Sequence, residues 1–398
     1  MAPPAPLTAR HLGRATLARQ GLLEPIATPA ADAVARVGSL QAQHPEWPPV
    51  ALAARAATRD AADLAGALHR REVVRSSLMR ITIHVVAAAD LWSMFTVMRP
   101  LRLAQWRSLL KADPFDSSLG RRMTAAHEVA IAALRERPHS SLELDRLMGA
   151  ETGIEASATT RPAWRDPDSR VVVRAAWRHF AAVVPLVHVP HDGEGYGRSR
   201  YALASDWLGV DDPAILEADA RVHLTRRYLG AFGPASIDDL VAYVGRGQGG
   251  IAAWREAVAA LGDEVVTLRA DDGRTLLDLV EARRPDPDMP APPRLLARWD
   301  SLLLSHGARH RQRVIADEHR PLVFSKNADV VPGFLVDGVV AGTWELSRTD
   351  GCAAITLRPF ARLPRTEAEA LVAEAERVLD LLIGPEETRS VELARGRS

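Results

Sequence analysis

The sequence is poor in cysteine, in lysine and in long apolar runs, and each shortage narrows what the protein can be. Cys352 is the only cysteine among 398 residues, which excludes a disulfide framework and a cysteine-based zinc site. No apolar run is long enough to span a membrane, and the first residues lack the basic and apolar regions of a secretory signal. We therefore expect a cytoplasmic protein with no membrane partner.

The sequence also has no net charge, because 50 basic side chains balance 50 acidic ones. A strongly basic balance is typical of nucleic-acid-binding proteins, but a local basic surface is sufficient to bind phosphate. We expect about half of the clustered arginines to lie on solvated helix faces or in ion pairs. The clusters comprise Arg70, Arg71, Arg75 and Arg80, then Arg161, Arg165, Arg170, Arg174 and Arg178, then Arg309, Arg311 and Arg313.

Three segments share one pattern, in which a helix start, a turn and a second helix are followed by β-branched strands. Thr8 is a predicted N-cap, and Ser140 and Ser236 have an acidic residue three positions later, as in a capping box. The strands are expected at 81–86, at 183–189 with 200–203, and at 265–269 with 275–279. A helix-turn-helix followed by a hairpin is a winged helix. The length allows two or three domains.

We accordingly predict a mainly α fold with small β-sheets (α+β), in which tandem winged-helix motifs form a concave scaffold. The predicted domains are 1–130, 131–215, 216–290 and a C-terminal β-rich region, 291–398, that closes on the cleft. In this last region we expect a small antiparallel sheet over 331–357, a helix over 367–383 and a frayed tail after Gly384.

Two glutamines flank one small apolar residue in the segment 39–45 (SLQAQHP). The amides of Gln41 and Gln43 share a side only if the backbone is extended, and Pro45 biases His44 away from the helix. We therefore expect a helix to end near Leu40 and both amides to enter one cleft. Such pairs are more often solvated or bonded to local backbone, so the pattern alone is weak.

Other polar residues have two possible roles. Along a strand, Arg80, Thr82 and His84 share a face, which forms either a cleft wall or the solvated face of an edge strand. Asp300 either caps the following helix, which we favour, or reaches the cleft. The pattern His188-x-x-His191-Asp192 lacks further ligands at convincing spacing, so we expect no metal and no cofactor.

Five motifs together resemble the AlkZ/YcaQ-type DNA glycosylases, a family built from tandem winged helices. They are residues 39–45 (SLQAQHP), 75–86 (RSSLMRITIHVV), 228–236 (YLGAFGPAS), 299–306 (WDSLLLSH) and 336–344 (VDGVVAGTW). In this family the catalytic pair is Gln-x-Gln in the AlkZ branch and Gln-x-Asp in the YcaQ branch. The resemblance thus places the chain in the AlkZ branch, with Gln41 and Gln43 as its catalytic residues.

The resemblance implies a monofunctional enzyme that removes N7-alkylated purines from double-stranded DNA, including bulky adducts and interstrand crosslinks. Its role would be repair or self-resistance to a DNA-alkylating natural product, and we expect a monomer. The substrate-binding or DNA-binding residues would be Arg75, Arg80, Thr82, His84, Asp300, Arg309 and Arg313. Two alternatives stay open, a winged-helix transcription regulator without catalysis and a protein-binding scaffold.

A protein of zero net charge can bind phosphate only if its charges are segregated. We therefore predict that one concave face gathers Arg75, Arg80, Arg309 and Arg313. Acidic residues are expected elsewhere, namely Asp211, Asp212, Asp238 and Asp239.

Overall fold

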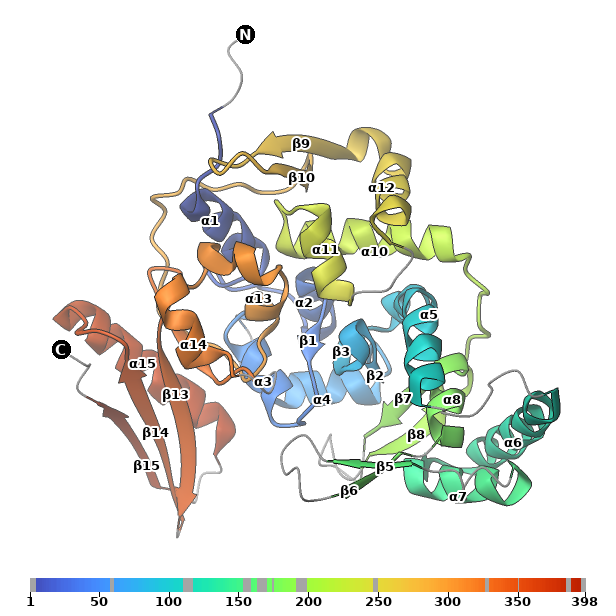
Figure 1. Ribbon diagram of the computed structural model, residues 1–398. Helices are drawn as coiled ribbons and strands as arrows, with labels where there is room; N and C mark the ends of the chain where they lie inside the picture. The colour runs from blue at the N-terminus through green and yellow to red at the C-terminus, as the bar shows by residue number, and fades with distance from the viewer. Residues whose placement is uncertain are drawn as a thin grey trace.

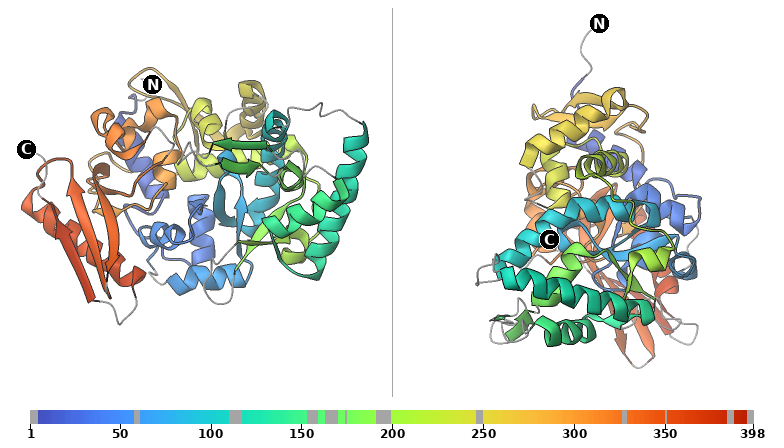
Figure 2. Two further views of the ribbon diagram at one scale, coloured as in Figure 1. Left: turned by 60° about the horizontal axis from the view of Figure 1, so that its bottom comes forward. Right: turned by 90° about the vertical axis from the view of Figure 1, so that its right-hand side faces the viewer.

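The computed structural model describes residues 5–57, 61–109, 117–152, 159–162, 170–173, 175–190, 199–245, 250–325, 329–349, 351–383 and 388–394. Helices and strands are mixed along the chain, in an elongated molecule. The C-terminal sheet lies at one end and helix α6 (Ser117–Glu136) at the other (Figures 1 and 2). No helix in the described ranges is both long and apolar enough to cross a membrane.

The N-terminal part supplies one half of a central sheet. Thr8 caps α1 (Ala9–Arg19), and α2 (Ala30–Val37) ends at Gly38, whose φ of 85° no other residue type readily adopts. After α2 come β1 (Leu40–Gln41), α3 (Trp47–Ala53), α4 (Ala61–His69), β2 (Val73–Ser77) and β3 (Ile83–Ala87). The predicted helix end near Leu40 is confirmed, and the strand predicted at 81–86 is present but begins at Ile83, because Met79–Ile81 form a 3-10 turn.

The other half of this sheet comes from the second predicted unit. After α5 (Leu91–Leu109) and α6, which lie wholly or mostly within the first predicted unit, come β4 (His139–Ser140), α7 (Ser141–Thr152), β5 (Thr159–Pro162), β6 (Arg170–Val173), α8 (Ala175–Val183), β7 (Leu186–Val189) and β8 (Arg200–Leu203). The six strands run in the order β1-β3-β2-β7-β8-β4, and β2 meets β7 at the pair Arg75 and His188. One sheet thus crosses the predicted boundary at 130, which itself falls inside α6.

The third unit has the predicted order of helices and hairpin. After α9 (Ala204–Leu208) come α10 (Glu217–Phe232), α11 (Ile237–Val244), α12 (Gly250–Ala260), β9 (Val265–Arg269) and β10 (Thr275–Leu279). Ser236 and Asp239 form the predicted capping box at the start of α11, and Ser140 and Glu143 form the one before α7. The hairpin pairs Thr275 with Arg269, as its turn residues indicate.

The C-terminal region combines a five-stranded sheet with two short helices and one long one. It contains β11 (Arg294–Leu295), α13 (Ser301–Leu304), α14 (Arg320–Val323), β12 (Gly333–Val336), β13 (Val339–Thr349), β14 (Cys352–Pro359), α15 (Arg365–Leu382) and β15 (Thr388–Leu393). The expectation of a frayed tail is wrong, because β15 pairs in parallel with β14 along its whole length. The tail completes the edge of the sheet by pairing its backbone groups.

One apolar core joins the N-terminal and C-terminal parts. Leu40 and Ala42, which flank Gln41, are buried together with Val85 of β3, Ile355 of β14 and Val378 of α15. Burial of these side chains fixes the path of the backbone between the two glutamines. The site is therefore positioned by packing from both ends of the chain.

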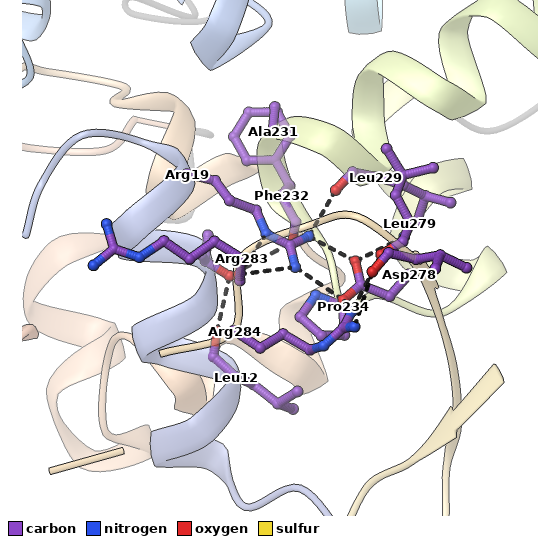
Figure 3. A network of polar contacts seen from close by, with 12 residues as sticks. Leu12, Arg19, Leu229, Ala231, Phe232, Pro234, Asp278, Leu279, Arg283 and Arg284 are labelled. Carbon is purple, nitrogen blue, oxygen red and sulfur yellow. Dashed lines mark hydrogen bonds and ion pairs between the residues drawn. The ribbon is translucent and has the colours of Figure 1, made fainter. Parts of the chain in front are cut away.

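Buried ion pairs hold α1 and its neighbours in place. Arg19 donates two hydrogen bonds, of 2.7 and 2.9 Å, to Asp278 of β10 and a third to the Leu229 carbonyl (Figure 3). A Cβ on Gly233 would lie 2.5 Å from Nη1 of Arg19 and 2.7 Å from Oδ1 of Asp278, so this position admits only glycine. Gly233 of the motif 228–236 is thereby explained by packing around an ion pair.

Candidate functional site

The segment that carries the two glutamines is extended through β1, as predicted, and Gln43 lies in the bend that follows. Gln41 lies opposite His84 in the β1–β3 ladder, and the N–H of Ala42 continues the ladder to the Ile83 carbonyl at 2.7 Å. Leu40 and Ala42 are buried in the core, whereas the side-chain oxygen of Gln41 lies near Arg80 and Thr82 and that of Gln43 accepts the N–H of Ile83. Both amides thus face the turn that joins β2 to β3.

Gln41 is buried and its side-chain oxygen is surrounded by donors. Oε1 lies 3.4 Å from Nη2 of Arg80 and 3.5 Å from the hydroxyl of Thr82. Only 7% of Gln41 is exposed. The single hydroxyl hydrogen of Thr82 is directed to the Met79 carbonyl at 3.0 Å, so Arg80 is the donor to this oxygen and one of its two lone pairs can accept a further hydrogen bond.

Gln43 is exposed and is held by the same turn. Its Oε1 accepts the N–H of Ile83 at 3.2 Å. One lone pair of this oxygen and both amide N–H groups are left for other partners. The two glutamines therefore present neutral hydrogen-bonding groups side by side, one from inside the protein and one at its surface.

His84 stays neutral beneath Gln41. Its Nδ1 lies 2.9 Å from the Thr82 carbonyl, which can only accept, so Nδ1 carries the proton. Nε2 is buried without a hydrogen-bond partner among the described residues. Burial, together with the charge of Arg80, lowers the pKa of His84 to about 3. The expectation that His84 lies on a cleft wall is wrong, because its side chain is completely enclosed.

Arg75 holds the backbone between the glutamines. Its Nε and Nη2 donate to the Ala42 carbonyl at 3.2 and 3.0 Å, and Nη1 lies 3.4 Å from Nδ1 of His188. The side chain is 5% exposed. Two donors on one carbonyl fix the peptide orientation on which both amide directions depend.

Arg80 occupies a strained turn and points inward. Arg80 and Ile81 have φ angles of 55° and 58° in η1 (Met79–Ile81), a region that costs β-branched residues energy. Nη1 of Arg80 donates to the Tyr243 carbonyl at 2.5 Å, and its guanidinium lies over the Tyr243 ring. Tyr243 in turn bonds the hydroxyl of Ser39 at 2.9 Å. Helix α11 therefore supports the turn that contacts Gln41.

A cavity of about 370 Å³ opens beside Gln43. Its walls come from β2, the β2–β3 turn, α5, α8, β7 and β8. The lining residues are Gln43, Ser76, Ser77, Ile81, Ile83, Arg102, Gln105, Trp106, Trp177, Arg178, Ala181, Ala182, Leu186, His188 and Tyr201. The cavity therefore lies at the junction of the first two predicted units.

The prediction that one concave face gathers Arg75, Arg80, Arg309 and Arg313 is wrong. Arg75 and Arg313 are buried, and Arg313 donates to the Pro234 carbonyl at 2.8 Å inside the third unit. Asp239, expected far from these arginines, is buried beside Arg313 and bonds His310 and the Gly307 N–H. Arg309 is exposed on η5 (Ala308–Arg313), so its predicted phosphate contact is compatible with its position and stays a prediction. Asp211, Asp212 and Asp238 are exposed.

Asp300 caps α13, which is the role that we favoured for it from the sequence. Its Oδ1 accepts the Leu302 N–H at 2.9 Å, and the carboxylate pairs with the fully buried guanidinium of Arg55 at 2.5 Å. It does not reach the cavity. Thr82, predicted with it as a binding residue, is half-buried and bonds the Met79 carbonyl.

The structure also brings together residues that the sequence did not single out. Arg102, Trp106, Trp177 and Tyr201 line the cavity, although no spacing links them along the chain. Among the described residues no three His, Cys, Asp or Glu side chains are grouped as metal ligands, and His191 and Asp192 lie outside those residues. The expectation of no metal stays a prediction.

Known proteins match both the sequence and this arrangement. The family described as "DNA glycosylase AlkZ-like" matches residues 34–381, which include both glutamines and every element of the site. The chain belongs to the AlkZ-like DNA glycosylase family. This confirms the resemblance on which the assignment of Gln41 and Gln43 depends.

A curated protein and a solved structure, both from Streptomyces sahachiroi, are also similar to this chain. A curated protein named "Interstrand DNA cross-link repair glycosylase" is 25% identical over 235 residues, which span 58% of this chain and 59% of that protein. The solved structure of the DNA glycosylase AlkZ has a TM-score of 0.77, with 21% identity over 98% of this chain and all of that chain. At this identity the structural likeness shows that the fold is shared.

Proposed function

We propose that this AlkZ-like protein is a monofunctional DNA glycosylase that hydrolyses the N-glycosidic bond of N7-alkylated purines in double-stranded DNA. Bulky adducts and interstrand crosslinks are included among its substrates, in line with the name of the curated relative. Family membership supports the reaction class. The observation that carries the proposal is the convergence of the Gln41 and Gln43 amides on one turn beside an open cavity.

The proposed chemistry suits neutral amides. Alkylation at N7 makes the purine cationic, so it leaves without a strong general acid. The remaining tasks are to stabilise an oxocarbenium-like sugar and to hold a water below C1′. Carbonyl dipoles of Gln41 and Gln43 perform both, because they are oriented before the reaction begins. Unmodified purines leave too poorly for this machinery, which gives selectivity for damage.

Arg75 and Arg80 act as positioning residues in this proposal. Arg75 fixes the Ala42 peptide between the glutamines, and Arg80 orients the Gln41 amide. Neither arginine is therefore proposed as a phosphate contact. Exposed Arg309 keeps that proposed role, which positions DNA without reading its sequence.

The remaining proposals concern architecture and biology. The helix and hairpin order of the third unit supports winged-helix motifs in a concave scaffold, and a monomer suffices because both glutamines come from one chain. The biological role would be repair of alkylated DNA or self-resistance to a DNA-alkylating natural product. No metal or cofactor is needed for hydrolysis of this kind, so activity should survive excess chelator.

The decisive experiment uses duplex DNA with a single 7-methylguanine and measures base release in single turnovers. Gln41→Ala and Gln43→Ala should each lower the rate on the order of 10²-fold to 10³-fold, as loss of one preorganised dipole does in other enzymes. DNA affinity should change little, because the amides act on the transition state. Gln312→Ala, at an exposed glutamine on η5, is the matched control.

Two outcomes would contradict the proposal. Base release at the parent rate in both single mutants would remove the glutamines from the mechanism. If the wild-type protein binds the duplex but releases no base from it, the winged-helix regulator becomes the better assignment.

A further inference from the structure

Three large aromatic side chains line the cavity beside Gln43. Trp106, Trp177 and Tyr201 line it, with the imidazole of His188 next to Tyr201. The Trp177 and Tyr201 rings are 4.7 Å apart, and those of His188 and Tyr201 are 4.5 Å apart. We propose that this cavity binds a planar, electron-rich aromatic substituent carried by the lesion, rather than the alkylated base itself.

The charge of the cavity favours the aromatic substituent over the alkylated base as its ligand. Arg102 and Arg178 line it, and no carboxylate occurs among its described lining residues. Nη1 of Arg102 donates to the Ala181 carbonyl at 2.6 Å. Its Nε and Nη2 have no hydrogen-bond partner in the described part of the chain. An N7-alkylated purine is a cation and is repelled by this wall. A neutral or anionic aromatic group is attracted by it.

Protonation of the neighbouring groups supports the same preference. Burial lowers the pKa of Arg102 to about 10, so the guanidinium keeps its charge at neutral pH. Burial and the charge of Arg75 hold the pKa of His188 well below its usual range, so its ring is neutral. The cavity thus combines neutral aromatic surfaces with fixed positive charge.

Size and position complete the argument. A volume of about 370 Å³ suits a small ring system, near the lower end for ligand sites. Gln43 lines the cavity and Gln41 does not, so the ligand would lie on the exposed side of the catalytic pair. In a glycosylase, which is the function proposed above and on which this inference rests, that is where a substituent projecting from N7 would be held.

Binding without DNA tests the cavity independently of catalysis. Titration calorimetry should detect binding of naphthalene-2-sulfonate, and the matched cation 2-naphthylmethylammonium should bind more weakly. Trp177→Ala should weaken the anion about tenfold, a typical loss for one stacking aromatic. Arg178→Gln should also weaken it, at an exposed position where the substitution does not disturb the core.

Control variants separate a specific loss of binding from a general loss of folding. Trp207→Ala removes a tryptophan outside the cavity and should leave binding unchanged. If Trp177→Ala does not fold, Trp177→Phe and Arg178→Gln provide the comparison. Equal binding of cation and anion, no binding of either, or unchanged affinity in both Trp177→Phe and Arg178→Gln would overturn the proposal.

Catalysis then shows whether the cavity serves the lesion. Two duplexes of one sequence are compared, carrying 7-methylguanine or N7-(2-naphthylmethyl)guanine. At subsaturating enzyme, Trp177→Ala should slow release of the naphthylmethyl adduct about tenfold and change 7-methylguanine by no more than about twofold. Equal losses on both substrates would mean that the cavity holds the base, which overturns the proposal. If the wild type releases neither base, the proposed function fails, and the calorimetry still decides the cavity.

Discussion

Arg19 and Arg55 each face a buried carboxylate, whereas Arg80 and Arg102 bond backbone carbonyls and have no carboxylate partner in the described ranges. The first two belong to the framework around α1, and Figure 3 shows the Arg19 pair within it. Arg80 contacts Gln41, and Arg102 lines the cavity beside Gln43. The framework neutralises its buried charges, and the site keeps its positive charge.

This difference has an energetic reason. A buried guanidinium without a counterion is costly, so a framework built for stability pairs it. At the site this energetic cost is not offset by a carboxylate, and it occurs beside a cavity and a strained turn. Such energetically unfavourable features are common at functional sites. The four predictions below test this contrast, from the largest expected effect to the smallest.

Removal of Asp300 should cost the most. Asp300→Ala leaves the Arg55 guanidinium buried without its partner and removes the cap of α13. Unfolding in urea should show a loss of about 3–5 kcal/mol. Asp380→Ala, which breaks an exposed pair with Arg389, should cost no more than about 1 kcal/mol. Similar losses in the two variants would contradict the contrast.

Replacement of Arg75 should affect catalysis more than binding. Arg75→Lys cannot place two donors on the Ala42 carbonyl, so both glutamines lose their alignment. We expect kcat to fall about 100-fold, as for small misplacements of catalytic groups, with KM for DNA nearly unchanged. Arg70→Gln, at an exposed pair with Glu72, is the control. A rise in KM at constant kcat would assign Arg75 to DNA binding instead.

Acid should destabilise the protein through His84. Its pKa is about 3 in the folded protein and about 6.5 when unfolded, so the unfolded state binds the extra proton between these values. Stability therefore falls as pH drops from about 6.5 toward 3, by at most about 1.4 kcal/mol per pH unit for one such group. His84→Asn can keep a bond to the Thr82 carbonyl and should flatten this slope in urea unfolding at several pH values. An unchanged slope would show that the pKa of His84 does not differ between the folded and unfolded states.

Charge removal at Arg309 should have the smallest effect. Arg309→Gln should reduce the slope of log affinity against log salt by about one unit, because one phosphate contact is lost. Damaged and undamaged DNA should weaken equally, since such contacts carry no lesion information. Arg365→Gln, at an exposed arginine of α15, serves as control in the same titration. If the slope is unchanged, Arg309 does not contact phosphate.

The sequence by itself determined the features that depend on neighbouring residues. Thr8, Ser140 and Ser236 cap their helices, the 265–279 hairpin forms, and the chain leaves α2 in an extended strand at Leu40 and Gln41. These outcomes follow from short-range hydrogen bonds and from alternation along a strand.

Only the tertiary structure decided where the arginines point and what the glutamines face. A guanidinium has five donors and a long stem, so its partners are whichever acceptors packing brings near. Arg75 reaches the carbonyl of Ala42, Arg313 is buried under the third unit, and Arg80 turns inward on a strained loop. The cavity needs residues from α5, α8 and β8 that share no pattern along the chain, because the sheet that unites them forms only when β2 pairs with β7.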